Sequence, residues 1–211
     1  MKLAPNGKLA DNAYRAVLHK ILSHELPGGS VIQERKLAEA MGVSRTPMRD
    51  ALGRLEGEGL LVRLTERLLA VRVITLEDYL HSLDVRAMIE PQAAALAVQH
   101  ITAEELASLE AKLAALERTK RPSPEMHWAF DDGLHETIAA RSGNPFLVRT
   151  IREMRRYTKI FERQTVPERH KPGVEDHRRI LAALSTGKPD KARDAMTEHI
   201  RNVRRRILDG Y

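Results

Sequence analysis

The stretch that decides the fold is Leu37-Ala-Glu-Ala-Met-Gly-Val-Ser-Arg-Thr-Pro-Met-Arg-Asp-Ala-Leu52. Its apolar spacing predicts a short helix that ends at Gly42, and a second helix that begins after Ser44 as the N-cap. Pro47 falls in the first turn of this second helix, where a missing N–H does no harm. Two helices joined by so tight a turn are typical of a helix-turn-helix. The alternative is an ordinary helical hairpin with a solvated basic face.

The second helix of this pair carries its polar side chains at its start: Ser44, Arg45, Thr46 and Arg49. Arg45 and Arg49 are four residues apart, so both project from one face of the helix. The N-terminus of a helix attracts phosphate through its free N–H groups and its dipole. Arginine side chains placed there can reach base edges or phosphates in a major groove. The pattern therefore points to DNA.

The flanking sequence extends this prediction to the whole chain. A helix is expected over residues 9–24, and two short apolar segments, 60–64 and 68–73, predict a two-stranded hairpin. Beyond residue 75 only helices are expected, over residues 76–99, 103–119, 124–141, 145–164, 173–186 and 189–208. The predicted fold class is mainly α, with a helix-turn-helix and hairpin over 1–74 and an all-helical domain over 75–211.

Composition excludes several classes of protein. The 211 residues contain no cysteine, which rules out disulfides, thiolate zinc sites and iron–sulfur clusters. The net charge is +6; residues 1–74 carry 12 Lys and Arg against 8 Asp and Glu, and the remainder carries 23 against 21. This excess favours an anionic partner for the first domain. No secretory signal is visible and no apolar run could span a bilayer, so a cytoplasmic protein without a membrane partner is expected.

A second informative stretch is Phe130-Asp-Asp-Gly-Leu-His135. Asp131 and His135 are four residues apart on a predicted helix and share a face. His177 and His199 fall on the last two predicted helices, and a helical bundle can bring them to the same interior point. Spacing alone leaves two interpretations open: half of a metal site, or a pair on the surface of a helix.

Residues 33–62 closely resemble the winged helix-turn-helix of GntR-family bacterial transcription regulators. The core Val43-Ser-Arg-Thr-Pro47 matches without a gap, and the opening residues 27–32 also fit. The resemblance implies that Arg35, Arg45, Thr46 and Arg49 contact DNA, with Ser44 beside them. The family usually has a glycine at the tip of the wing. Residues 65–70 contain none, so Arg67 is the candidate for a charged wing contact.

The chain after residue 75 resembles the all-helical (FCD-type) effector-binding domain of the fatty-acid-regulator-like branch of that family. The matching segments are 85–90, 131–135, 142–145, 176–180 and 199–200. The resemblance implies a divalent metal ion held by four residues: Asp131, His135, His177 and His199. One carboxylate and three imidazoles suit zinc, nickel, manganese or iron. Arg86 is expected to face the ligand cavity, or else to form a surface salt bridge with Glu90.

Together these features predict a ligand-responsive transcription regulator. We expect a metabolite-sensing repressor that binds a short inverted repeat of operator DNA as a homodimer. A small carboxylate effector would bind at the metal, with Arg86 holding its other end. Two alternatives remain: a metal-dependent, hydrolase-like enzyme, since a metal with open positions can activate water, and a direct metal sensor. No separate general base or nucleophile set stands out to support the enzyme.

Overall fold

The computed structural model describes residues 6–165 and 173–210. Its internal contacts divide the chain into two compact units. The N-terminal unit is Met1–Thr75 with Lys159–Thr165, and the C-terminal unit is Leu76–Thr158 with Val166–Tyr211. The helix break that the sequence predicts at Pro167–Pro172 lies outside the described residues, as do the first five residues of the segment searched for a signal peptide.

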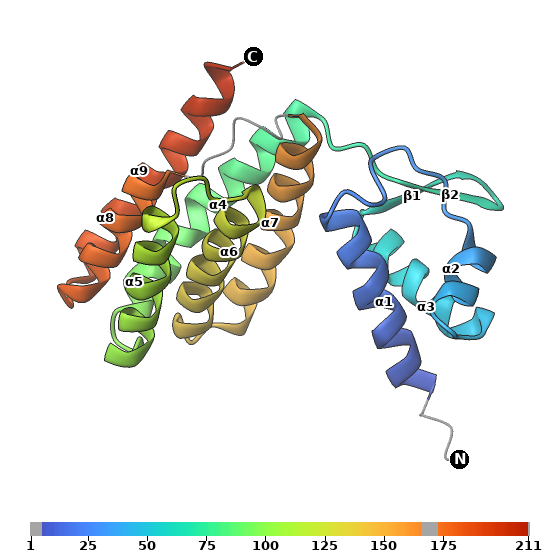
Figure 1. Cartoon of the computed structure of the whole chain (residues 1–211), viewed down its shortest axis with the longest axis horizontal. Helices are drawn as coiled ribbons and strands as arrows, with labels where there is room; N and C mark the ends of the chain where they lie inside the picture. The colour runs from blue at the N-terminus through green and yellow to red at the C-terminus, as the bar shows by residue number, and fades with distance from the viewer. Residues whose placement is uncertain (1–5, 166–172, 211) are drawn as a thin grey trace. The chain divides into compact units, whose positions relative to one another are not determined.

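The N-terminal unit contains helices and a hairpin in the predicted order (Figure 1). Its elements are α1 (Asn6–Leu22), α2 (Glu34–Ala40), α3 (Arg45–Gly57), β1 (Leu61–Thr65) and β2 (Leu68–Val71). The two strands are antiparallel, with Leu61 opposite Val71. The first strand is shifted by one residue from the predicted 60–64, and the second ends two residues before the predicted 73. The layout is that of a winged helix-turn-helix.

The core of this unit lies between α1 and α3. Helix α3 buries Met48 and Leu55 completely, and α1 contributes Val17 at the same level of burial. Gly42, between α2 and α3, has a φ of +62°, a left-handed conformation that glycine adopts without a steric penalty. The apolar face of α3 is thus fixed against α1, which leaves its polar face available for contacts outside the unit.

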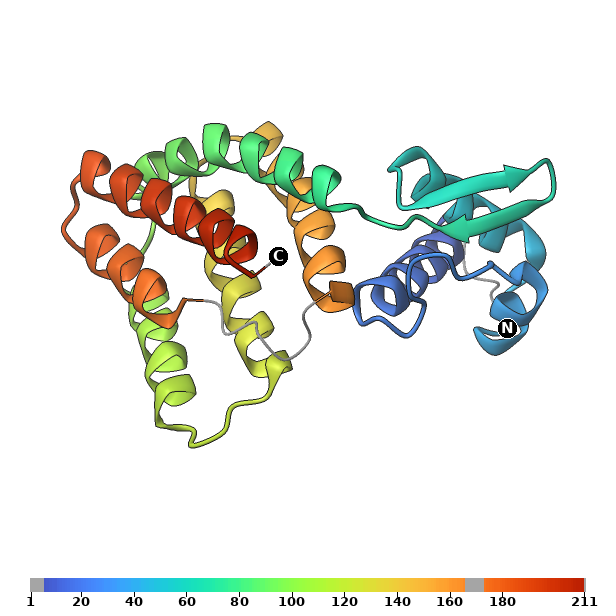
Figure 2. The same cartoon turned by 90° about the horizontal axis from the view of Figure 1, so that it is seen from above.

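The C-terminal unit is entirely helical in the part that the structure describes. Its helices are α4 (Leu76–Ala97), α5 (Ala103–Arg118), α6 (Pro124–Arg141), α7 (Pro145–Thr165), α8 (Val174–Ser185) and α9 (Pro189–Leu208). The last residues of α7, Lys159–Thr165, belong to the N-terminal unit. Helix α4 runs along α9, α8 packs against α9 and α5, and α6 packs against α4 and α5 (Figure 2). The described helices include none that is both long and apolar enough to cross a membrane.

Local signals define where these helices begin. Thr102 and Glu105 form a reciprocal capping box at the start of α5. Asn144 Oδ1 accepts hydrogen bonds from the backbone N–H groups of Phe146 and Leu147 at the start of α7. Helix α4 continues through Pro91. With these boundaries, buried polar side chains of α4, α6, α8 and α9 lie in the interior of the C-terminal unit.

Candidate metal centre and DNA-binding groove

Four metal-ligating side chains meet in the interior of the C-terminal unit. Asp131 and His135 come from α6, His177 from α8 and His199 from α9. Each offers a ligand atom, these atoms all lie within 4.8 Å of one another, and the four residues are between 1% and 7% exposed. The structure thus brings together the four residues singled out in the sequence. It also excludes a surface location for the pair on α6.

At least one ring nitrogen of each histidine in this cluster has no hydrogen-bond partner among the described residues. His135 Nε2, His177 Nε2 and His199 Nδ1 are buried and have no hydrogen-bond partner among the described residues. Asp131 Oδ1 lies 3.0 Å from His177 Nε2, in a contact not directed as a hydrogen bond, and 3.7 Å from His135 Nε2. An unsatisfied buried polar atom usually costs about 1–3 kcal/mol. Buried nitrogens gathered within 4.8 Å of one another and of a carboxylate oxygen fit a divalent cation, which would satisfy them.

Neighbouring charges set the protonation states that metal binding requires. Burial by itself would raise the pKa of Asp131, but the Arg155 guanidinium and two nearby histidine rings hold it well below its ordinary value. Burial lowers the pKa of His135 and, together with two neighbouring rings, that of His199. At neutral pH the carboxylate is therefore ionised and both imidazoles are neutral, which are the forms that bind a metal.

A second set of buried side chains, on α4 and α7, supports His135 of α6. His135 Nδ1 lies 2.5 Å from Glu90 Oε2, and Glu90 Oε1 accepts a hydrogen bond of 2.5 Å from Arg86 Nε. Arg86 Nη1 also donates to Thr158 Oγ1 over 3.1 Å. Arg86 and Glu90 are each 2% exposed. The salt bridge that the sequence offered as an alternative for Arg86 is present, but it is buried rather than on the surface.

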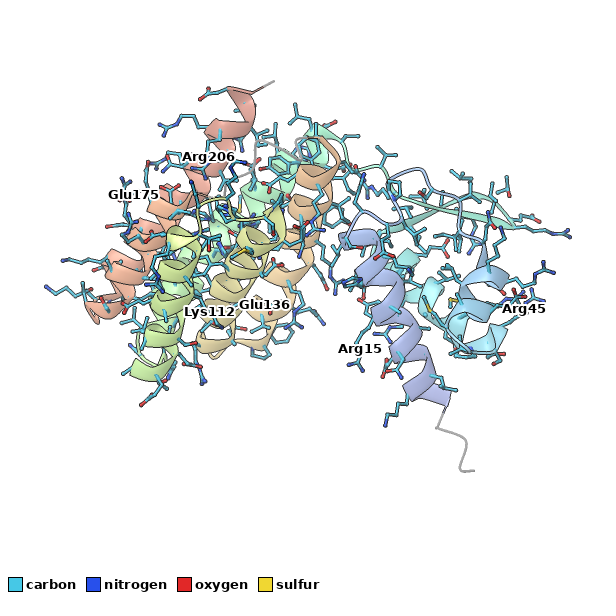
Figure 3. The ribbon with its side chains drawn as sticks, viewed as in Figure 1. Arg15, Arg45, Lys112, Glu136, Glu175 and Arg206 are labelled. Carbon is cyan, nitrogen blue, oxygen red and sulfur yellow. The ribbon has the colours of Figure 1, made fainter. Side chains whose placement is uncertain are left out.

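Two further buried groups were missed by sequence reasoning. Arg155 Nη2 on α7 donates to Asp131 Oδ2 over 2.6 Å and to Asp132 Oδ1 over 2.9 Å. Asp176, next to His177, accepts from Asn202 Nδ2 and from Arg206 Nη1, both over 2.9 Å, which joins α8 to α9. Figure 3 labels Arg206 on α9. Adjacency to a candidate ligand was the only signal for Asp176, and Arg155 gave none.

The candidate DNA-contacting residues lie in the N-terminal unit. Ser44 occupies the N-cap of α3 as predicted, but its side chain makes no capping hydrogen bond. Arg45 and Arg49 are exposed, and both donate from Nε to Glu34 Oε1, over 3.1 and 3.0 Å. In Figure 3 Arg45 lies beside α2, on the side of the unit away from α1. One carboxylate at the start of α2 thus holds both candidate base-reading side chains.

A groove of about 630 Å³ separates α3 from the hairpin. Arg45, Arg49 and Arg67 line it together with Arg63, whereas Arg35, Ser44 and Thr46 do not. Arg63 donates to both carboxylate oxygens of Glu56, over 2.9 and 2.7 Å. Arg67 lies in the turn between β1 and β2, at the tip where the family usually has glycine. The groove therefore carries cationic and anionic side chains in alternation.

Comparison with known proteins agrees with this architecture. Residues 81–202 match the FCD domain family, and residues 9–71 match the bacterial regulatory proteins of the gntR family. The chain belongs to the GntR family of regulators with an FCD domain. It is 29% identical over 191 residues to the Nta operon transcriptional regulator of Aminobacter aminovorans, and the match covers 89% of each chain. It is 27% identical to the Glc operon transcriptional activator of Escherichia coli K12, over 95% of this chain and 88% of that one.

Solved structures support the fold. The Escherichia coli McbR/YncC structure superposes with a TM-score of 0.81 at 22% identity, covering 96% of this chain and 98% of that one. The predicted fold class, a winged helix-turn-helix followed by an all-helical domain, is confirmed. The family and its relatives are transcriptional regulators rather than enzymes, so the enzyme alternative is set aside. The GntR regulator described here is a DNA-binding transcription regulator.

The buried pair of Arg155 and Asp131 gives a prediction about stability. Replacing Arg155 by Met should lower the free energy of unfolding of the metal-free protein by about 3–5 kcal/mol, because buried Asp131 loses its counter-charge. Adding Asp131→Asn to that variant should recover part of the loss. Denaturant unfolding in the presence of a chelator is measured for the wild type, the two single variants and the double variant, which form a double-mutant cycle. Strictly additive effects would mean that the two side chains do not stabilise each other.

Proposed function

We propose that this GntR regulator is a metabolite-responsive operon repressor that binds operator DNA as a homodimer and senses a small carboxylate at a metal centre. Two features support the proposal. The N-terminal unit exposes arginines on the polar face of α3, and the C-terminal unit buries four metal-ligating side chains with unpartnered nitrogens. The second of these carries the proposal, because nothing in a purely structural helical bundle requires such a cluster.

The DNA contacts proposed for this regulator follow from the placement of α3. Ser44, Arg45, Thr46 and Arg49 lie at its N-terminal end, the part of a recognition helix that reaches base edges in the major groove. Arg35 on α2 is assigned to the phosphate backbone. Arg67, at the tip of the hairpin, is assigned to the minor groove. Guanidinium groups suit both tasks, since they bind guanine edges and phosphates with paired hydrogen bonds.

Replacing Arg45 or Arg49 by Ala should weaken operator binding by about 1–3 kcal/mol if the side chain reads a base. A phosphate contact would instead weaken binding on all sequences alike and flatten its dependence on salt. Fluorescence anisotropy with DNA from upstream of the protein's own gene, and with unrelated DNA, separates the two. Arg15→Ala, at an exposed position of α1, removes the same charge elsewhere on the unit and serves as the matched control. Wild-type binding by both variants would exclude α3 as the recognition helix.

A homodimer is proposed because a single helix-turn-helix reads only a few base pairs, and two-fold symmetry implies an inverted repeat. The C-terminal unit offers an apolar surface for it. On α4, Met88 is 72% exposed and Leu96 is 43% exposed, and both lie on one face of the helix.

Light scattering at micromolar concentration should give twice the mass of one chain. Met88→Glu should shift the protein toward the monomer, because pairing would then place two carboxylates in an apolar contact. Ala87→Glu, at an exposed position on another side of α4, is the control for an added charge on the same helix. A monomeric wild type, both free and on DNA, would remove this part of the proposal.

The metal centre is proposed to consist of Asp131, His135, His177 and His199, with zinc, nickel, manganese or iron as the ion. The charges around the site are compatible with a divalent cation. Three buried carboxylates surround it, those of Glu90, Asp131 and Asp176, against two buried guanidinium groups, those of Arg86 and Arg155. A bound ion would supply a Lewis-acidic centre whose remaining coordination positions accept an oxygen ligand.

A small carboxylate is the proposed effector, since its oxygens suit such a centre. Arg86 is proposed to hold the other end of the effector. Its Nε and Nη1 are occupied by Glu90 and Thr158, which leaves the N–H groups of Nη2 for a further carboxylate. The same cluster of four side chains also supports a direct metal sensor. That alternative predicts that the metal ion alone changes DNA binding.

Protein purified without chelator should contain close to one divalent ion per chain by elemental analysis. The double variant His177→Ala, His199→Ala should lose the ion, and its thermal shift with small carboxylates should disappear, while DNA binding persists. The exposed histidines His81 and His100, both changed to Ala, provide the matched control. Stoichiometric carboxylate binding by the metal-free double variant would contradict a metal-dependent effector site.

A further inference from the structure

Glu90 is a fully buried acidic side chain that the proposed function does not use. It lies on α4, 2% exposed, and its two oxygens have different partners. Oε1 accepts from Arg86 Nε over 2.5 Å, and Oε2 lies 2.5 Å from His135 Nδ1. The contact therefore joins α4 to α6, between residues that are 45 positions apart in the sequence.

We infer that Glu90 is a positioning residue that fixes the tautomer and the ring orientation of His135 for metal binding. This inference rests on the proposed metal centre. A carboxylate held by a guanidinium group only accepts hydrogen bonds, so His135 Nδ1 must donate its hydrogen to Glu90. A neutral imidazole carries one N–H, which leaves the lone pair on Nε2. That nitrogen has no hydrogen-bond partner among the described residues and lies 3.7 Å from Asp131 Oδ1.

The carboxylate of Glu90 is itself held in place. Arg86, one turn earlier on α4, engages it with Nε and donates from Nη1 to Thr158 Oγ1 of α7 over 3.1 Å. The hydroxyl groups of Thr158 and Ser82 are 3.4 Å apart, and both residues are buried. Carboxylates that orient a metal-bound imidazole in this way raise its basicity and set its geometry.

In the part of the chain that the structure describes, the other two histidines have no carboxylate contact as short as that of His135. There, His177 has no hydrogen-bond partner at either ring nitrogen, and His199 Nδ1 has none and lies 4.0 Å from Asp176 Oδ2. On α6, by contrast, His135 is oriented by Glu90, and Asp131 by Arg155. The two ligands of α6 therefore form a preorganised half of the site, and the ligands of α8 and α9 form an adaptable half.

Glu90→Gln tests this assignment with little change in shape. Gln has an oxygen in only one of the two positions that the carboxylate oxygens occupy, so its NH₂ group must face either Arg86 Nε or His135 Nδ1. The pair of acceptors that fixes the ring is thereby lost. Affinity for Zn²⁺ alone, measured by competition with a chromogenic chelator, should fall about 10–100-fold. Glu77→Gln, an exposed change on the same helix, should leave it unchanged. Wild-type Zn²⁺ affinity in Glu90→Gln would overturn the inference.

The tautomer is measured independently of any metal. In metal-free wild-type protein, ¹⁵N NMR of the imidazole rings should show the hydrogen of His135 on Nδ1, and Glu90→Gln should change that signal. A hydrogen on Nε2 in the wild type would overturn the assignment. This measurement stands even if Glu90→Gln fails to fold, because it needs only the wild type. A wild type that has the expected tautomer but binds no divalent ion would reject the proposed metal centre, and with it the role of Glu90 in metal binding. The orientation of the His135 ring by Glu90 would still stand.

Discussion

Three imidazoles and one carboxylate are buried together in the C-terminal unit, and much of the surrounding structure compensates for that burial. Groups taken out of water lose hydration, and the low dielectric makes each unpaired one costly. Asp131 is neutralised by Arg155, and Glu90 by Arg86. Asp176 is held by Asn202 and Arg206. Each compensating contact crosses between helices or fixes one helix internally, so the polar cluster also determines how α4, α6, α7, α8 and α9 can pack.

This dependence gives the C-terminal unit a means of responding to a ligand. A buried apolar side chain that moves loses packing contacts but leaves no charge unpaired. In a buried network of ion pairs, each partner that moves leaves another charge unpaired. A ligand that changed the charge or position of Asp131 would change its ion pair with Arg155. A ligand that moved Arg86 would change its ion pair with Glu90, and through Glu90 the contact with His135. Such discrete rearrangements are the kind of two-state element on which ligand control depends.

The N-terminal module could be predicted from local sequence because its signals are local. Gly42 in a left-handed conformation, Ser44 at an N-cap and Pro47 in a first turn are properties of single turns of chain. The ligand cluster is different. Spacing placed Asp131 and His135 on one face of a helix and His177 and His199 on the last two helices, but only the family resemblance favoured one metal site made of all four. The residues that support the cluster were not predicted, since Glu90 and His135 meet only through the packing of α4 on α6. Even the pair of Arg86 and Glu90 was placed on the surface as an alternative, because α4 buries alanines on several sides and its periodicity does not reveal an outer face.

The carboxylate of Glu34 has a consequence for how the winged module meets DNA. Arginines that lie in the open give a protein its general attraction to any duplex, because each neutralised phosphate releases a condensed cation. Arg45 and Arg49 already share an anion within the protein, as does Arg63 with Glu56. With the proposed DNA contacts, fewer cations would therefore be released on an arbitrary sequence than the number of arginines suggests. Encounters with random DNA would then be brief, and lasting occupancy would require a site whose base edges and phosphates outcompete the internal carboxylate.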